Sequence, residues 1–199
     1  MKKLKKKKLE DALLRIFTKM KKELCQEIEI PEGVQVEIAE NLVTVKGSEG
    51  ELKRRFNFGK LNKDVKEGKV VIGHKQSTKT EKKMMNTIKA HINNMMKGVQ
   101  EKFVYELKSV FSHFPMTVEV NENVVTIKNF LGEKIPRTFK VPEGAEIKID
   151  KENITVSALD KEIAGRAAAL FETSTKVGNR DRRVFQDGVY ITNKAGKEM

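Results

Sequence analysis

Apolar and polar residues alternate in two separate regions of the chain, and alternation at every second position predicts β-strands with one buried face. The first region starts at residue 34 and the second at residue 116, and in each a Glu-Asn pair follows the first strand. Asn tolerates the left-handed backbone of a tight turn, so each pair is expected to connect two strands. Pro-Glu-Gly turns at 31–33 and 142–144 are expected to start strands. Each region is predicted to form one antiparallel sheet. The predicted strands are 34–38, 42–46, 52–58 and 70–72 in the first region and 116–120, 124–128, 135–141 and 154–156 in the second.

A helical pattern follows each set of strands, with apolar residues three or four positions apart. The first helix is predicted over 77–98, where a serine or threonine at its start can serve as the N-cap with Glu81 as its capping-box partner. Gly98 is then expected to act as the C-cap. The methionine-rich face of this helix is compatible with core packing or with a pliant binding groove, and core packing is the expectation. A second helix is predicted over 160–175, with the aspartate at its first position as the N-cap, and alternation over 103–111 predicts a strand that leads into the second region.

The two regions are copies of one another. Residues 34–56 align with residues 116–138 without a gap at an offset of 82, and ten of the 23 aligned positions are identical. This period is too long for a solenoid unit and suits a small domain. We therefore predict an α+β fold: a tandem duplication of a small domain with an antiparallel sheet and one packed helix, plus a basic N-terminal helix. The predicted parts are a helical extension over 1–26, a first repeat domain over 27–101, a second repeat domain over 102–178 and a basic C-terminal tail packed on the second domain over 179–199.

The net charge of +12 is concentrated at the start of the chain. Residues 1–22 contain ten basic and two acidic residues, whereas the remainder contains 30 basic and 26 acidic residues. An amphipathic helix with a lysine-rich outer face is predicted there from the spacing of Leu9, Leu13, Ile16, Met20 and Leu24. This arm is compatible with binding to nucleic acid, to an anionic membrane surface or to the first domain, and also with a solvated tail.

The sequence lacks the patterns that catalysis or metal binding requires. It contains no phosphate-binding or dinucleotide-binding glycine motif and no nucleophile elbow. His74, His91 and His113 have neither metal-ligand nor catalytic-triad spacing, and a positional or packing role is expected for His113. The single Cys25 cannot form an internal disulfide, which fits a reducing compartment. There is no secretory signal and no apolar stretch long enough to span a membrane. We therefore predict no catalytic residue, no metal, no cofactor and no small-molecule substrate, so the protein is not expected to be an enzyme.

The C-terminal segment 175–190 combines arginines, glycines and aromatic residues. Arginine forks match phosphate oxygens, and aromatic rings can stack on unpaired bases. Phe185 and Tyr190 are compatible with base stacking or with holding the tail on the second domain. The candidate RNA-binding residues are Lys134, Arg137, Lys176, Arg180, Arg182, Arg183, Phe185 and Tyr190, with Lys53, Arg54 and Arg55 as a secondary set and Lys5, Lys6, Lys7 and Lys8 as N-terminal contacts.

Several blocks of the sequence resemble those of one family of RNA-binding proteins. The blocks are IPEGV at 30–34, MKGV at 96–99, SVFSHFP at 109–115, KNFLGEK at 128–134 and RRVFQDGVY at 182–190. In this order they resemble the large-subunit ribosomal protein six family (universal L-six), in its archaeal and eukaryotic form, over roughly residues 27–193.

The resemblance implies a duplicated α+β fold and a structural, non-enzymatic role in the large subunit of the cytoplasmic ribosome. It also implies binding to large-subunit rRNA near the sarcin–ricin loop and the stalk base. The expected neighbours there are other ribosomal proteins and the docking site of translational GTPases, and no contact with a membrane is expected. Residues 1–26 depart from the family pattern, so the resemblance gives that arm no role. The alternatives are an RNA-binding module outside the ribosome and a membrane-surface protein carried by the N-terminal helix.

Overall fold

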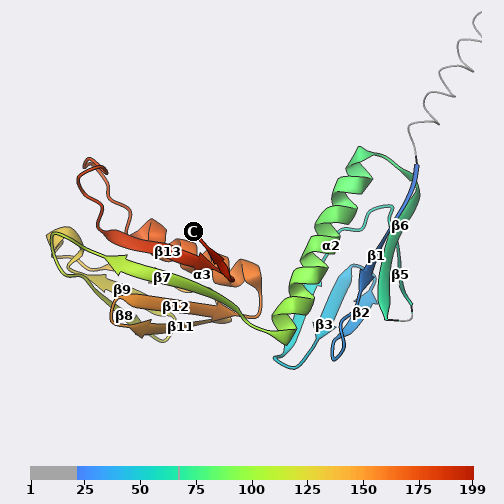
Figure 1. Cartoon of the computed structure of the whole chain (residues 1–199), viewed down its shortest axis with the longest axis horizontal. Helices are drawn as coiled ribbons and strands as arrows, with labels where there is room; N and C mark the ends of the chain where they lie inside the picture. The colour runs from blue at the N-terminus through green and yellow to red at the C-terminus, as the bar shows by residue number, and fades with distance from the viewer. Residues whose placement is uncertain (1–21, 67) are drawn as a thin grey trace, which may run out of the picture. The chain divides into compact units, whose positions relative to one another are not determined.

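The computed structural model describes residues 22–66 and 68–199 (Figure 1). Contacts within this part of the chain divide it into two compact units. The first unit contains residues 22–47 and 53–96, and the second contains residues 48–52 and 97–199.

The first copy of the repeat contains two antiparallel sheets and one long helix. Its elements are β1 (Lys22–Glu29), β2 (Gln35–Ala39), β3 (Leu42–Lys46), β4 (Glu51–Arg55), β5 (Asn62–Lys66), β6 (Lys69–Ser77) and α2 (Lys79–Gln100). One sheet has the order β2-β3-β4 and the other has the order β1-β6-β5. The methionine-rich face of α2 is core, as expected, because Met85, Ile88, Ile92 and Met95 are buried.

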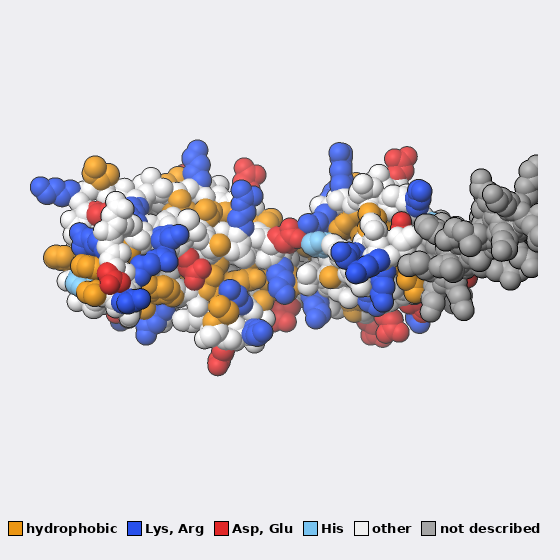
Figure 2. Space-filling view, turned by 90° about the horizontal axis from the view of Figure 1, so that it is seen from above, with side chains coloured by type: hydrophobic (Ala, Val, Ile, Leu, Met, Phe, Trp, Pro, Cys, Tyr) orange, Lys and Arg blue, Asp and Glu red, His pale blue; other side chains and the backbone are white. Residues whose placement is uncertain are grey.

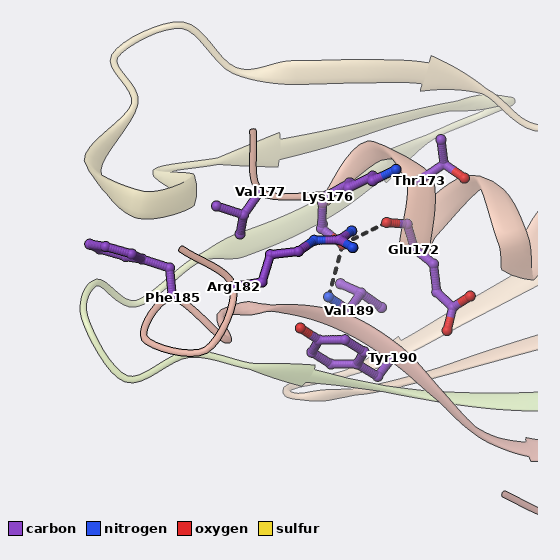
Figure 3. A pocket seen from close by; sticks show the side chains of 9 residues that line it. Glu172, Thr173, Lys176, Val177, Arg182, Phe185, Val189 and Tyr190 are labelled. Carbon is purple, nitrogen blue, oxygen red and sulfur yellow. Dashed lines mark hydrogen bonds between the residues drawn. The ribbon is translucent and has the colours of Figure 1, made fainter. Parts of the chain in front are cut away.

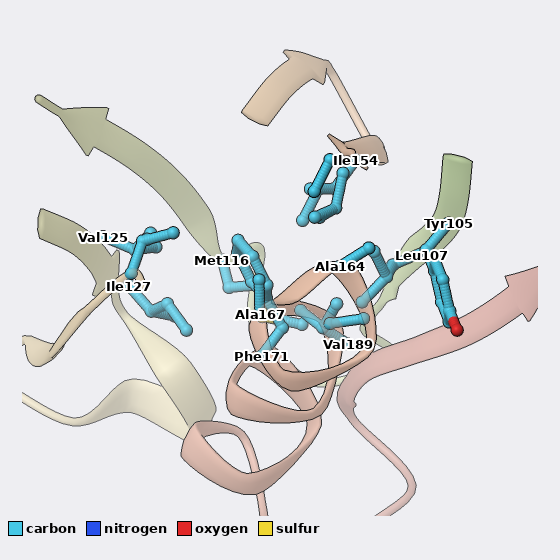
Figure 4. Close-up of a cluster of buried hydrophobic side chains, with 14 of the residues drawn as sticks. Tyr105, Leu107, Met116, Val125, Ile127, Ile154, Ala164, Ala167, Phe171 and Val189 are labelled. Carbon is cyan, nitrogen blue, oxygen red and sulfur yellow. The ribbon is translucent and has the colours of Figure 1, made fainter. Parts of the chain in front are cut away.

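The second copy repeats this arrangement and extends it. Its elements are β7 (Phe103–Val110), β8 (Thr117–Asn121), β9 (Val124–Lys128), the 3-10 turn η1 (Phe130–Gly132), β10 (Arg137–Lys140), β11 (Ala145–Asp150), β12 (Asn153–Ala158), α3 (Lys161–Ser174), β13 (Gly188–Lys194) and β14 (Lys197–Glu198). The sheets have the orders β10-β9-β8 and β11-β12-β7-β13-β14. Figure 4 shows Ala164, Ala167 and Phe171 of α3 packed among side chains from these strands, including Leu107 and Val189.

The strand orders confirm the α+β fold class and the duplication. The order β1-β6-β5 in the first copy corresponds to β7-β12-β11 in the second, and β13 is added to the outer edge of β7. The prediction of one sheet in each copy is wrong. The last predicted strand of each copy, β6 or β12, pairs with the strand that precedes the repeat, β1 or β7, instead of with the preceding meander. Strand partners are decided by long-range packing, which local alternation does not encode.

The predicted N-terminal helix is wrong for its last residues, because residues 22–26 lie in strand β1. Leu24 fits a helical spacing with the preceding apolar residues, but pairing with β6 determines the conformation. Leu24, Gln26 and Ile28 are more buried than the residues between them, as expected for a strand with one covered face. Residues 1–21, which carry the rest of the predicted helix and Lys5 to Lys8, lie outside the described residues.

The predicted turns are present, and so is the predicted N-cap of each helix. Thr78 N donates a hydrogen bond to Glu81 Oε2 at 2.8 Å, and Asp160 Oδ1 accepts one from Glu162 N at 2.9 Å. Both Pro-Glu-Gly segments turn at a glycine with φ of 81° and 87°. In the Glu-Asn turns, however, Glu40 and Glu122 have positive φ, so the left-handed residue is the glutamate and not the asparagine.

Gly98 does not act as the predicted C-cap, because α2 continues to Gln100. A Cβ atom added at Gly98 would lie 2.0 Å from the carbonyl oxygen of Leu159. The glycine is therefore required by the close approach of another backbone segment. The C-terminal turn of α2 can lie against Leu159 only when position 98 has no side chain.

We expect Gly98→Ala to destabilise the second unit by about 1–3 kcal/mol, the usual cost of overpacking. Alanine would otherwise favour a helix over glycine by about 1 kcal/mol. The measurement is urea unfolding followed by tyrosine fluorescence, since the chain has two Tyr and no Trp and both Tyr105 and Tyr190 lie in the second unit. Gly178→Ala is the matched control, because a Cβ there meets nothing within 4 Å. A Gly98→Ala protein as stable as the control would contradict this account.

Candidate RNA interface

Three loops of the second unit are tied together at one end of its sheets (Figure 1). They are residues 111–116, residues 129–136 and the tail loop, which we define as residues 178–187. Asn129 Nδ2 donates to the carbonyl oxygen of Pro115 at 2.9 Å and so joins the first two loops. The tail loop is joined to the first through Asp187, as described next.

Asp187 is a buried anion that holds the tail loop in place. Its side chain is 2% exposed and accepts hydrogen bonds from Ser112 N (3.2 Å), Ser112 Oγ (2.9 Å), His113 N (3.2 Å) and His113 Nδ1 (3.0 Å). Burial would raise the pKa of Asp187, but the hydrogen bonds from His113 and Ser112 outweigh it and lower the pKa to about 2. Sequence reasoning missed this residue. The available signal was one acidic residue inside an otherwise basic and aromatic block.

Phe185 packs on the same histidine. Its ring stacks on that of His113, with the centroids 4.9 Å apart and the planes at 22°, and the Arg180 guanidinium lies 4.8 Å from the Phe185 centroid. This geometry shows Phe185 holding the tail loop on the second unit. His113 has the packing role that the sequence indicates, because it contacts both Asp187 and Phe185.

Arg137 uses its guanidinium within the protein. Nε and Nη2 donate to the Glu133 carboxylate at 2.8 and 2.5 Å, and Nη1 donates to the carbonyl oxygens of Ser174 at 2.8 Å and Lys176 at 3.1 Å. The guanidinium also lies 4.3 Å from the centroid of the Phe130 ring. The hydrogen bond from Arg137 lowers the pKa of Glu133, so the pair is ionised at neutral pH. Arg137 thus fastens the second loop to the end of α3, and few of its donors remain for a phosphate.

A cleft of about 480 Å³ lies between the end of α3, the tail loop and β13 (Figure 3). Lys176 and Arg182 supply cationic groups to its lining, and Phe185 and Tyr190 supply aromatic rings. Tyr190 is 46% exposed, and its hydroxyl donates to the carbonyl oxygen of Gln186 at 2.9 Å. At the floor, Val189 N donates to Thr175 Oγ1 at 2.9 Å. The cleft therefore offers cations and an exposed aromatic ring on a hydrogen-bonded frame.

The remaining predicted residues fall in three places. Lys134 is exposed on the loop 129–136, and Arg183 is exposed on the tail loop, next in sequence to Arg182 of the cleft. The secondary set, Lys53 to Arg55, lies at the end of β4 in the first unit and so forms a separate group. Sequence reasoning also missed exposed apolar side chains on these loops: Phe114, Ile135 and Val184 are 49%, 81% and 62% exposed. Figure 2 shows apolar and cationic side chains side by side at this end of the second unit.

The described residues contain no group of three or more His, Cys, Asp or Glu side chains arranged to hold a metal ion. No helix within the same residues is long and apolar enough to cross a membrane.

A duplicated α+β domain with cations and an aromatic ring around a cleft is the arrangement expected of a protein that binds a polyanion. The model of the family described as Ribosomal protein L6 matches residues 30–102 and again residues 114–188. The chain belongs to this ribosomal protein family. The two matched segments confirm the predicted duplication and resemblance, and a family of ribosomal proteins confirms the prediction that the chain is not an enzyme.

Curated relatives match nearly the whole chain. A protein named large ribosomal subunit protein uL6 from Methanobrevibacter smithii is 47% identical over 169 residues, which is 85% of this chain and 95% of that protein. Proteins of the same name from Methanococcus vannielii and Methanosarcina mazei are 46% and 41% identical, over 87% and 88% of this chain and 96% and 100% of theirs.

Proposed function

We propose that this protein is a structural constituent of the large subunit of the cytoplasmic ribosome and that its second unit binds large-subunit rRNA. The observation that carries the RNA contact is the cleft lined by Lys176, Arg182 and Tyr190, and the exposed Arg183 and Lys134 of the same unit add to its positive charge. The names of the curated relatives, each a large ribosomal subunit protein, support the ribosomal setting. The finer location we propose is near the sarcin–ricin loop and the stalk base, beside other ribosomal proteins and the docking site of translational GTPases.

The residues around the cleft divide into groups that contact RNA and groups that hold the loop. Arg182, Arg183, Lys176 and Lys134 bind phosphate oxygens, and the exposed ring of Tyr190 stacks on a base. Asp187, Arg137, Phe185 and His113 fix the loops before RNA arrives, which reduces the entropy lost on binding. Arg180 belongs to both groups, since its guanidinium lies over Phe185.

Two further sets of cations add affinity. Lys53, Arg54 and Arg55 form a secondary contact in the first unit, and Lys5 to Lys8 neutralise additional phosphates. Each phosphate that a cation neutralises steepens the dependence of affinity on salt.

The proposed function is tested by sedimentation of the tagged chain with large ribosomal subunits through a high-salt wash. We expect the chain to remain with the subunit, because several ordered arginine–phosphate contacts survive partial screening. Recovery in the free fraction, while purified chain still binds rRNA, would instead indicate an RNA-binding module outside the ribosome.

A further inference from the structure

A groove of about 430 Å³ lies in the first unit between the end of β4 and one face of α2. Arg54 and Arg55 line it from β4, and Thr80, Lys83 and His91 line it from α2. Lys83 lies three positions after Thr80 and eight positions before His91, so these residues share one face of the helix. The groove therefore receives cations from two elements that are far apart in sequence.

The floor of this groove is aromatic. Phe56 is buried, the Arg54 guanidinium lies 5.6 Å from its ring centroid, and the His91 ring lies 5.9 Å from it at 41°. Apolar side chains of α2 extend this floor. An apolar floor between cations can contact the apolar side of a ribose while the cations bind the flanking phosphates.

The charge of the lining selects the ligand class. Three cationic side chains line the groove, and within the described chain no Asp or Glu is among its lining residues. The cleft of the second unit, by contrast, includes the carboxylate of Glu172. A lining with several positive charges and no negative charge favours a polyanion over a protein surface of mixed charge.

Comparison of the two copies shows that this site is a divergence and not a shared feature of the fold. Arg55 aligns with Arg137 in the repeat. Arg137 is committed to Glu133 and to two carbonyl oxygens, whereas Arg55 is exposed and lines the groove. The same position thus holds a loop in the second copy and presents a guanidinium to solvent in the first.

We propose that the groove of the first unit binds a second stretch of RNA sugar–phosphate backbone, so that one chain holds two RNA segments. The proposal rests on the proposed function and deepens it. In the groove, Lys83, Thr80 and His91 of α2 lie opposite the two arginines of β4. Arg54, Arg55 and Lys83 contact phosphates, and Thr80 and His91 add hydrogen bonds.

The test uses the full chain and a large-subunit rRNA transcript. The groove variant is Arg55→Ala/Lys83→Ala, and the tail variant is Arg182→Ala/Arg183→Ala. The matched control is Lys60→Ala/Lys75→Ala, which removes two exposed charges of the first unit outside the groove. Affinity is measured over a range of salt concentrations, hydroxyl-radical footprinting gives the protected nucleotides, and circular dichroism checks folding.

We expect the groove variant to bind roughly fivefold to twentyfold more weakly than the control and to lower the slope of log affinity against log salt by about one to two. It should lose one set of protected nucleotides and keep the set that the tail variant loses. If the double variant unfolds, Lys83→Ala alone, on the exposed surface of α2, should still remove part of that first set.

A groove variant that matches the control in affinity and footprint overturns the second site, and the proposed function stands as long as the tail variant is impaired. Unchanged binding to naked rRNA with weaker sedimentation with the large subunit would also overturn it, because the groove would then contact a protein. Wild-type chain that protects no nucleotides would overturn the proposed function itself.

Discussion

Replacing Arg180, Arg182 and Arg183 together by Ala is expected to weaken binding to large-subunit rRNA by at least tenfold. An ordered arginine–phosphate pair contributes about 1–3 kcal/mol by analogy with charged hydrogen bonds, and about 1.4 kcal/mol corresponds to a factor of ten. The three effects are not expected to add, because the arginines share one loop. The measurement is rRNA affinity at one fixed salt concentration.

The matched comparison is the triple variant Lys53→Ala/Arg54→Ala/Arg55→Ala in the first unit, which also removes three charges. It is expected to lose less affinity, because these residues lie on β4 and do not line the cleft in which cations stand beside the exposed ring of Tyr190. The double variant Arg182→Ala/Arg183→Ala separates RNA contact from the packing of Arg180 on Phe185. A larger loss in the first-unit variant, with both proteins folded by circular dichroism, would place the main RNA contact on the other unit.

Asp187→Asn is expected to destabilise the second unit by about 2–3 kcal/mol. Both carboxylate oxygens of Asp187 accept hydrogen bonds, so an amide would place its own N–H groups against the donors of Ser112 or His113. Urea unfolding followed by tyrosine fluorescence reports the change. Asp150→Asn, an exposed residue of β11 with the same change in charge, is the control and should be nearly neutral.

The effect of Asp187→Asn is also expected to depend on pH. Because the pKa of Asp187 is lowered to about 2 in the folded state, the stabilisation is fully present above the unfolded-state pKa near 4 and is lost as the pH falls towards 2. The linked free energy is on the order of 2 kcal/mol. The stability difference between wild type and Asp187→Asn should therefore be constant from pH 7 to pH 5 and shrink below pH 4. A difference that is equally large at pH 3 would show that the carboxylate charge is not its cause.

Local patterns were sufficient for both helices and for most strands of the repeat, but β1, β5, β13 and β14 were not predicted. Alternation predicted the hairpins at 34–46 and 116–128, and helical spacing with an N-cap predicted α2 and α3 to within about two residues. The internal repeat predicted the duplication, because two similar sequences bury similar faces. Charge and aromatic composition also indicated the tail loop as a candidate RNA contact.

The roles of individual site residues did not follow from these patterns. Arg137 and Arg182 are both arginines in basic loops, yet one is held by Glu133 and backbone carbonyls and the other lines a cleft. Asp187 would be read as a charge that offsets its arginine neighbours, but it is buried against Ser112 and His113. Residue type gives the chemistry a side chain can perform, while its partners decide which part of that chemistry is left for a ligand.

The sequence by itself therefore determined both helices, most strands of the repeat with their buried faces, and that one domain occurs twice. Only the tertiary structure decided that β6 pairs with β1, that β13 covers the edge of β7, and that Gly98 must admit the carbonyl of Leu159. The physical reason is the distance along the sequence between the residues that interact. Burial periodicity is a property of neighbouring residues, whereas strand partners, close backbone contacts and hydrogen bonds such as that between Ser112 and Asp187, 75 residues apart, depend on the free energy of the assembled unit.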